Sequence, residues 1–220
     1  MPAPRSLDND VRSATLVAAM RLFASHGFEG TALQDIADAV GVSKPAVLHH
    51  YPSKEHIRQA VLDSILEHWN LTLPRLLLAA TASHDRFDAV VGELLRFFAA
   101  DPDRARILLR ETLDRPVEMR RMLGRVVRPW LSTVAQYVRV GKEAGRHYAD
   151  VDDEAYVLHV IQLVVVATAC GSVTSTVIEG DAGARYEREL VRIARRSLFS
   201  PLAESRPARR TRRARPRAAE

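Results

Sequence analysis

Apolar residues recur three and four positions apart along most of the chain, and strand-like alternation is scarce. This spacing is the period of an amphipathic helix, so we predict an all-α fold. The expected helices fall into two groups, separated near Pro74. The first group spans 10–25, 31–40, 43–50 and 54–69, and the second spans 85–100, 103–114, 117–146 (bent at Pro129), 152–178 and 183–199.

Small and polar residues mark the expected ends of these helices. Gly27 and Gly41 stand where helices would end, because glycine adopts the left-handed terminal conformation at little cost. Thr31, Ser43 and Ser53 precede the next helices, where a hydroxyl can cap free backbone N–H groups. The early helices are therefore short and sharply separated.

Short helices followed by long apolar ones predict two domains. We expect a three-helix helix-turn-helix module over 1–60 and a larger helical bundle over 61–200. The segment 201–220 contains no large apolar residue from Pro207 onward, so it cannot bury a core and is predicted to be a disordered tail.

The stretch between Thr31 and Glu55 carries the most informative pattern. Ala37 is small where two short helices would cross, and Gly41 permits the tight turn between them. Ile36 and Val47 are apolar where these helices would share a core. The pattern predicts a helix-turn-helix.

A longer string, GFEGT…IA…GVSKPA…YPSKE, resembles the N-terminal DNA-binding domain of the TetR family of bacterial transcription regulators. The resemblance covers about residues 10–60. It implies a homodimer whose N-terminal modules bind a palindromic double-stranded DNA operator. It further implies a C-terminal domain that holds a small-molecule effector and forms the dimer contact, and a repressor that leaves DNA when the effector binds.

Under this resemblance the helix that begins after Ser43 is the recognition helix, which presents its first side chains to the major groove. Lys44 can donate to guanine, while Pro45 or Ala46 can pack on a thymine methyl group. Leu48 stands where relatives commonly have a phosphate-binding tyrosine, and Tyr51 is expected to pack beneath the helix. The DNA-binding candidates are Thr31, Gln34, Ser43, Lys44, Pro45, Ala46, His49, His50, Tyr51 and Lys54.

Charge is distributed unevenly along the chain. The net charge of +5 equals that of 201–220 alone, which holds seven arginines and two glutamates. The rest of the chain is neutral, and 1–58 carries six basic and six acidic side chains. A basic tail favours a polyanionic partner. An alternative function is therefore a DNA binder that acts through the tail without sequence preference.

The C-terminal domain is expected to hold a small apolar effector. Ligand pockets are mostly apolar with a few orienting polar groups. His159 and Gln162 are the most suggestive, since we expect them to face inward, where a buried polar side chain needs a partner. The ligand-binding candidates are Phe97, Arg110, Trp130, Tyr137, His159 and Gln162.

A helical-bundle metal enzyme is a further alternative. Glu143 and His147 lie four residues apart, but no second such pair appears, and one cysteine cannot form a thiolate cluster. Signatures such as HExxH, GxSxG or a phosphate loop are absent from the sequence. We therefore predict neither catalytic residues, nor a metal, nor a cofactor.

The segment 157–178 contains 22 residues without a formal charge, close to the length that spans a membrane. Polar residues interrupt it and its flanks are acidic, so we predict that it packs against protein instead. Its cover is the chain's own bundle or a second subunit, and the helices over 152–178 and 183–199 are the candidate dimer contact. The N-terminus lacks the apolar core of a signal peptide, which predicts a cytoplasmic protein.

Overall fold

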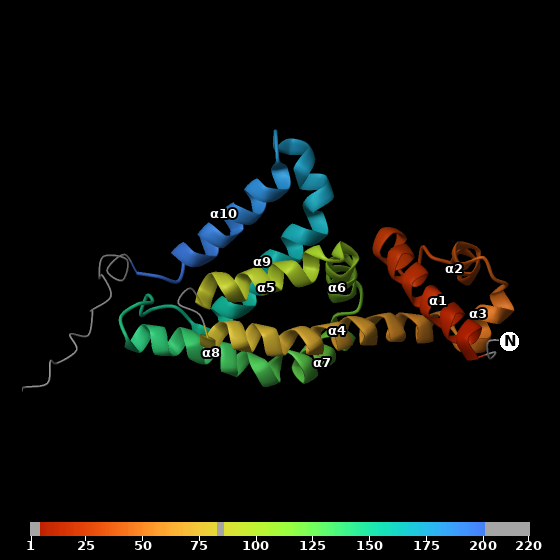
Figure 1. Cartoon of the computed structure of the whole chain (residues 1–220), viewed down its shortest axis with the longest axis horizontal. Coiled ribbons are helices and arrows are strands. Elements are labelled where there is room, and N and C mark those ends of the chain that lie inside the picture. The colour runs from red at the N-terminus through yellow and green to blue at the C-terminus, as the bar shows by residue number, and fades with distance from the viewer. Residues whose placement is uncertain (1–4, 83–85, 201–220) are drawn as a thin grey trace, which may run out of the picture.

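The structure is a computed structural model that describes residues 5–82 and 86–200, and the regular elements of these residues are all helical (Figure 1). Three helices, α1 (Arg5–His26), α2 (Leu33–Val40) and α3 (Lys44–His50), form a module at one end of the molecule. The long helix α4 (Lys54–Ala82) leads from this module into the larger bundle. The prediction of an all-α fold with a helix-turn-helix module and a larger bundle is confirmed.

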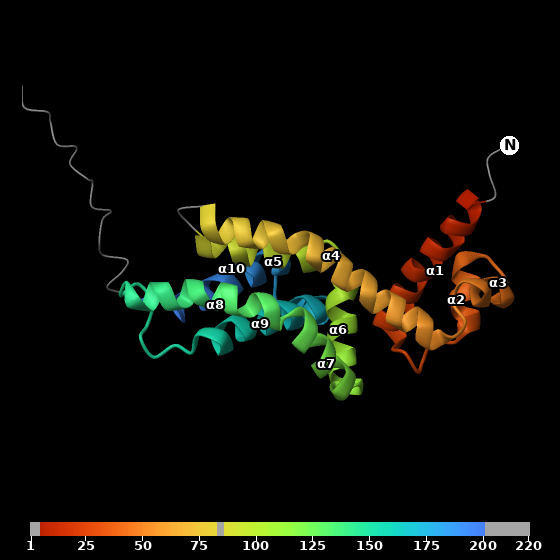
Figure 2. The ribbon, with the colours of Figure 1, turned by 90° about the horizontal axis from the view of Figure 1, so that it is seen from below.

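The larger bundle is built around α4 and its neighbours. Figure 2 shows α4 and α5 on one side and α8 and α9 on the other, while α6 and α7 lie between this bundle and the N-terminal module. Contacts between α4 and α5, α8 and α9, and α1 and α6 hold these layers together. The elements are α5 (Arg86–Ala99), α6 (Pro102–Asp114), α7 (Pro116–Val126), α8 (Arg128–Glu143), α9 (Asp153–Thr174), the 3-10 turn η1 (Ser175–Val177) and α10 (Ala182–Arg196).

The N-terminal module is built around buried apolar residues. Ile36, Ala37 and Val47 are fully buried, as the helix-turn-helix pattern requires. Phe23 of α1 and Ile57 of α4 belong to the same cluster, so the module is also packed against the first turns of α4. The two short helices thus gain from tertiary packing the stability that isolated helices of this length lack.

Two predicted helix boundaries near prolines were wrong, and α1 also begins at Arg5 instead of near residue 10. Helix α4 does not end near Trp69 but continues past Pro74 to Ala82. Pro74 cannot donate a backbone hydrogen bond, yet it is exposed and α4 packs along α5, so tertiary contacts outweigh the loss. The predicted bend at Pro129 is a break into two helices at Val127, and Pro129 lies in the first turn of α8, where its missing N–H costs little.

Most predicted helix ends are confirmed. Gly27 and Gly41 adopt φ values of 79° and 76° after α1 and α2. Ser43 Oγ accepts a hydrogen bond from the Ala46 N–H at 3.4 Å, and Ser53 Oγ accepts from the His56 N–H at 3.3 Å. These caps fix where α3 and α4 begin.

The cap assigned to Thr31 was wrong. The residue at the N-cap of α2 is Ala32, whose N–H donates to the Asp35 carboxylate at 2.7 Å. Thr31 is 1% exposed, and its hydroxyl donates to the Gly27 carbonyl at 2.8 Å. The hydroxyl therefore closes the loop after α1 instead of capping α2.

Helix α9 with its 3-10 extension is long and apolar enough to cross a membrane, judged by length and composition alone. In the structure it packs against α5, α6, α8 and α10. Its other face leaves apolar side chains exposed, so the chain's own bundle covers the helix on one side only. These exposed residues are Leu158, Leu163, Val166 and Val173.

Candidate nucleic-acid interface and ligand pocket

The turn between α2 and α3 sets the position of α3. The Gly41 N–H donates to the Asp38 carbonyl at 3.1 Å, and the Val42 N–H donates to the Ala37 carbonyl at 3.0 Å. These bonds close the end of α2, and the left-handed backbone at Gly41 turns the chain toward α3. A residue with a side chain would be strained there.

Helix α3 has one buried and one open face. Val47 is fully buried against α1 and α2. Ser43, Lys44, Pro45 and His49 are exposed, and Ser43 still caps the helix. The first turn of α3 therefore presents a cation and an apolar ring to the surroundings, in a backbone held rigid from behind.

Other predicted contacts lie beside this turn. Gln34 is exposed on α2, and its side-chain amide donates to the Asp38 carboxylate at 2.7 Å. Ala46 and His50 are half-buried, and the His50 ring lies edge-on to His49 with 5.3 Å between centroids. Gln34 must release or share its bond to Asp38 before it can contact a base.

Three of the DNA-binding candidates have their polar atoms turned into the protein. Tyr51 is 4% exposed and its hydroxyl donates to the Arg12 carbonyl, which confirms that it packs beneath α3. Lys54 Nζ donates to the carbonyls of Phe28 at 2.8 Å and Thr31 at 3.0 Å. The Thr31 hydroxyl is buried, as described above. Their polar groups hold the loop between α1 and α2 onto α4.

A buried arginine joins α4 to α6 and α7. Arg58 is 4% exposed and forms ion pairs with Glu55, Glu111 and Glu118. Burial lowers the pKa of Arg58, but hydrogen bonds to Glu55 and Glu118 and the charge of Glu111 outweigh it and raise the pKa above its usual value. Burial raises the pKa of Glu111 despite the pairing, and the hydrogen bond from Arg58 lowers the pKa of Glu118. Arg58 therefore stays charged.

The ring of Phe28 lies in the middle of this cluster. Cations of Lys54 and Arg115 lie 4.2 Å and 4.8 Å from its centroid, close enough for cation–π attraction. Arg110 on α6 donates to the carbonyls of Ala24 and Ser25, at the end of α1. Arg110 therefore binds the end of α1, and not the pocket that contains Trp130 and Tyr137.

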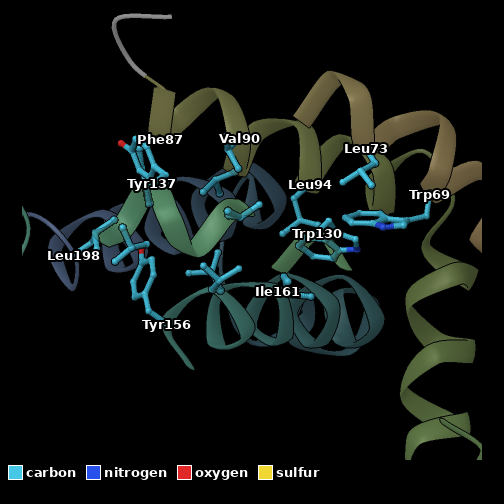
Figure 3. A pocket seen from close by; sticks show the side chains of 15 residues that line it. Trp69, Leu73, Phe87, Val90, Leu94, Trp130, Tyr137, Tyr156, Ile161 and Leu198 are labelled. Atoms are coloured by element: carbon cyan, nitrogen blue, oxygen red, sulfur yellow. The ribbon is translucent and has the colours of Figure 1, made fainter. Parts of the chain in front are cut away.

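A narrow apolar cavity of about 70 Å³ lies between α4, α5, α8 and α9 (Figure 3). It contains the predicted residues Trp130 and Tyr137, together with Trp69 of α4. The hydroxyl of Tyr156 in its wall donates to the Ala194 carbonyl at 2.7 Å. Its lining residues carry no formal charge: Trp69, Leu73, Phe87, Val90, Val91, Leu94, Trp130, Val134, Tyr137, Val138, Tyr156, Val157, Val160, Ile161 and Leu198.

A second apolar cavity of about 400 Å³ meets the first at the two tryptophans. Trp69 and Trp130 line both cavities, and their ring centroids are 5.2 Å apart. Phe97 is buried in the wall of the second cavity and lies edge-on to Trp69 at 5.3 Å. Phe97, Trp130 and Tyr137 thus lie around two neighbouring apolar cavities.

The expectation that His159 faces inward was wrong, because it is exposed on α9 and lines neither cavity. Gln162 is also exposed, but it is among the residues that line the second cavity. Since α9 is apolar almost all round, its sequence does not reveal which face points into the bundle. Trp69 was not among the predicted ligand-binding residues, because the fourth helix was expected to end there. Its large apolar ring, four residues after the buried Ile65, was the available signal.

The sequence pattern of bacterial regulatory proteins of the tetR family matches residues 16–61, from α1 into the start of α4. This segment therefore matches the TetR family. The matched residues include the turn at Gly41 and the exposed start of α3. The family match and the helix-turn-helix geometry described above therefore fall on the same residues.

Two curated regulators are similar to this chain over part of its length. HTH-type transcriptional regulator RutR of Escherichia coli K12 is 47% identical over 58 residues, which cover 26% of this chain and 27% of RutR. HTH-type transcriptional regulatory protein RaaS of Mycobacterium tuberculosis is 30% identical over 122 residues, 52% of this chain and 57% of RaaS. The chain thus spans about a quarter to just over half of these relatives.

The likeness of fold extends through the C-terminal bundle. The structure of the ketosteroid transcriptional regulator KstR2 of Mycobacterium tuberculosis matches with a TM-score of 0.65 and 15% identity. The match covers 86% of this chain and 95% of KstR2. At this identity the comparison establishes the shared all-α architecture. The named relatives are transcription regulators, not enzymes.

Proposed function

We propose that this protein is a cytoplasmic, effector-responsive regulator that binds a palindromic operator as a homodimer. The observation that carries the proposal is the exposed first turn of α3, with Lys44 and Pro45 directly after the Ser43 cap. A recognition helix contacts base edges with its N-terminal residues. Repression is the simplest mode, because occupying an operator is enough to exclude other proteins from the same duplex.

We assign base reading to Lys44, Pro45 and Ala46, and additional surface contacts to Gln34, Ser43, His49 and His50. Lys44 matches the acceptors of guanine, while Pro45 and Ala46 match a thymine methyl group. The module 1–58 is electrically neutral, so it neutralises few phosphates. The arginines of 201–220, which lie outside the described residues, supply the sequence-independent attraction in this proposal.

We propose that a second copy of the chain covers the open face of α9. Val166 and Val173 are 45% and 70% exposed there, and Ile193 on α10 is 46% exposed. Apolar side chains that gather on one surface mark interaction sites, and a twofold dimer buries the same surface on both copies. The dimer places two recognition helices for successive major grooves, about 34 Å apart.

We propose a domain division near residue 60, with the effector domain over 61–200. Helix α4 crosses this division and carries Arg58 near its start and Trp69 in the apolar cavity. Arg58 also binds α6 and α7. In this proposal the spacing of these helices differs between two dimer geometries. An effector that binds one geometry more tightly shifts the population toward it, and the size of the shift is set by the difference between its two affinities.

The experiment that tests this function is selection of bound duplexes from a random DNA pool by the full chain. We expect an enriched motif with two inverted half-sites. Lys44→Ala should relax the base preference within each half-site, whereas Arg96→Ala, an exposed change on α5, should leave the motif unchanged. Enrichment without a symmetric motif would count against the proposal.

The tail-driven alternative is tested with the same pool. Deleting 201–220 should preserve the motif and flatten the dependence of affinity on salt, because fewer counterions are released. If this deletion removed sequence selectivity while Lys44→Ala had no effect, the assignment of α3 as the recognition helix would be wrong.

A further inference from the structure

The two tryptophans that line both cavities each bury a hydrogen-bond donor without a partner. Trp69 and Trp130 are both 8% exposed, and neither indole Nε1 has a hydrogen-bond partner among the described residues. An indole nitrogen can only donate, and a buried donor left unpaired costs free energy. Two such donors on facing helices, 5.2 Å apart between ring centroids, mark one place in the bundle.

Few polar side chains lie around the two rings: Tyr137 and Tyr156 line the narrow cavity, Thr112 and Gln162 line the second, and neither indole nitrogen bonds to any of them. The ring of Phe97 lies edge-on to Trp69, with an interplanar angle of 79°, and a ring face accepts far more weakly than an oxygen. The hydroxyl of Tyr156 farther along the wall already donates to the Ala194 carbonyl. Figure 3 shows Trp69 and Trp130 side by side at one end of the narrow cavity.

The walls also restrict the charge and shape of an occupant. The residues that line the two cavities include no lysine, arginine, aspartate or glutamate. Burying a charge there would cost far more than its contacts return. The cavities of about 70 Å³ and 400 Å³ share the tryptophan pair, so an elongated molecule that reaches both of them must pass the two indole rings.

We propose that the effector is an uncharged, elongated, largely apolar molecule with one carbonyl or ether oxygen that accepts hydrogen bonds from the indole N–H groups of Trp69 and Trp130. This inference rests on the proposed function, since it names the ligand class of the same domain. The oxygen fixes the position of the molecule along the cavity, and the apolar walls supply most of the affinity.

Intrinsic fluorescence tests this directly, because the chain contains only these two tryptophans. The full chain is titrated with methyl heptyl ketone, with the alkene in which a methylene group replaces the carbonyl oxygen, and with octanoate. We expect saturable binding of the ketone, about fivefold weaker binding of the alkene, and the weakest binding of octanoate. Equal affinity for the three probes, or binding of none, would overturn the proposal.

Matched variants separate donation from packing. Trp69→Phe and Trp130→Phe each keep a ring and one fluorescent reporter, and each should lower ketone affinity about fivefold while leaving alkene affinity unchanged. Tyr148→Phe, outside the cavities, should change neither affinity. Equal loss of ketone and alkene binding would mean that the rings only pack, which would overturn the proposal.

The outcome is distinguishable from failure of the proposed function. If the same protein selects a symmetric DNA motif but does not discriminate ketone from alkene, only the effector inference fails. If it discriminates the probes but selects no motif, the inference about the pocket holds and the assignment as a DNA-binding regulator fails.

Discussion

At the scale of single residues, position 141 on α8 requires a glycine, because the ring of His147 packs directly against its backbone. It is buried beneath the His147 ring, and a Cβ built on Gly141 would lie 1.9 Å from His147 Nδ1. Gly141→Ala should therefore destabilise the protein by about 1–3 kcal/mol, as overpacked cores do. Urea unfolding measures the change.

Gly124 on α7 is the matched control, because no heavy atom lies within 4 Å of a Cβ built there. Gly124→Ala should stabilise by up to about 1 kcal/mol, since alanine favours the helix. A shift in the same direction for both variants would contradict the predicted contact between Gly141 and His147.

His147 itself predicts a dependence of stability on pH. Burial lowers its pKa below the usual value, the Arg146 charge adds to this, and the hydrogen bond between Nδ1 and the Val138 carbonyl opposes it. Below a pH of about 6.5 the unfolded chain gains a proton at this site that the folded chain resists, so stability falls as the pH decreases. His147→Gln should flatten urea-derived stability between about pH 5 and 7.

His68→Gln, which replaces an exposed imidazole on α4, is the matched control. An unaltered profile in His147→Gln would mean that His147 does not titrate differently in the folded and unfolded states.

At the scale of helices, the ion pairs of Arg58 hold α4 against α6 and α7. Arg58→Met should destabilise by about 3–5 kcal/mol, because it leaves the buried Glu111 carboxylate without its partner. Arg192→Met on α10 removes an exposed pair with Glu189 and should cost less than about 1 kcal/mol. Similar unfolding midpoints for both variants would contradict the role of Arg58.

Local chemistry predicted the helices better than their contacts. The glycines, the serine caps and the spacing of apolar residues were enough to locate α1, α2 and α3, because each of these signals depends only on residues within a few positions. The ion pairs of Arg58 with Glu111 and Glu118 join positions 53 and 60 residues apart, which no local pattern encodes. Pro74 fails as a helix breaker for the same reason, since α5 supports α4 from outside its own sequence.

The site was predicted unevenly. The open face of α3 follows from helix periodicity, because Val47 marks the buried side. Thr31 and Lys54 were predicted to be surface contacts, but the structure directs them to backbone carbonyls of a loop whose path the sequence does not specify. His159 on α9 was predicted to face inward but is exposed. Apolar residues lie on all sides of α9, so its sequence does not show which side is buried.

At the scale of the whole molecule, we predict a dimer whose two copies contact each other through α9. Val173→Asp should convert the dimer to a monomer with unchanged helical content, since it buries a charge in an apolar contact. Leu113→Asp on α6 is matched, because Leu113 and Val173 are 71% and 70% exposed, and it should leave the dimer intact. Sedimentation velocity with circular dichroism measures both, and a monomeric wild type would contradict the prediction.

The most direct test of the central claim is a hydroxyl-radical footprint on the duplex selected by the full chain. We predict two protected stretches on one face of the DNA, centred about 34 Å apart, and weaker protection of both by the Lys44→Ala variant. Protection spread evenly along the duplex, or a pattern indifferent to Lys44→Ala, would contradict the claim that α3 reads the operator.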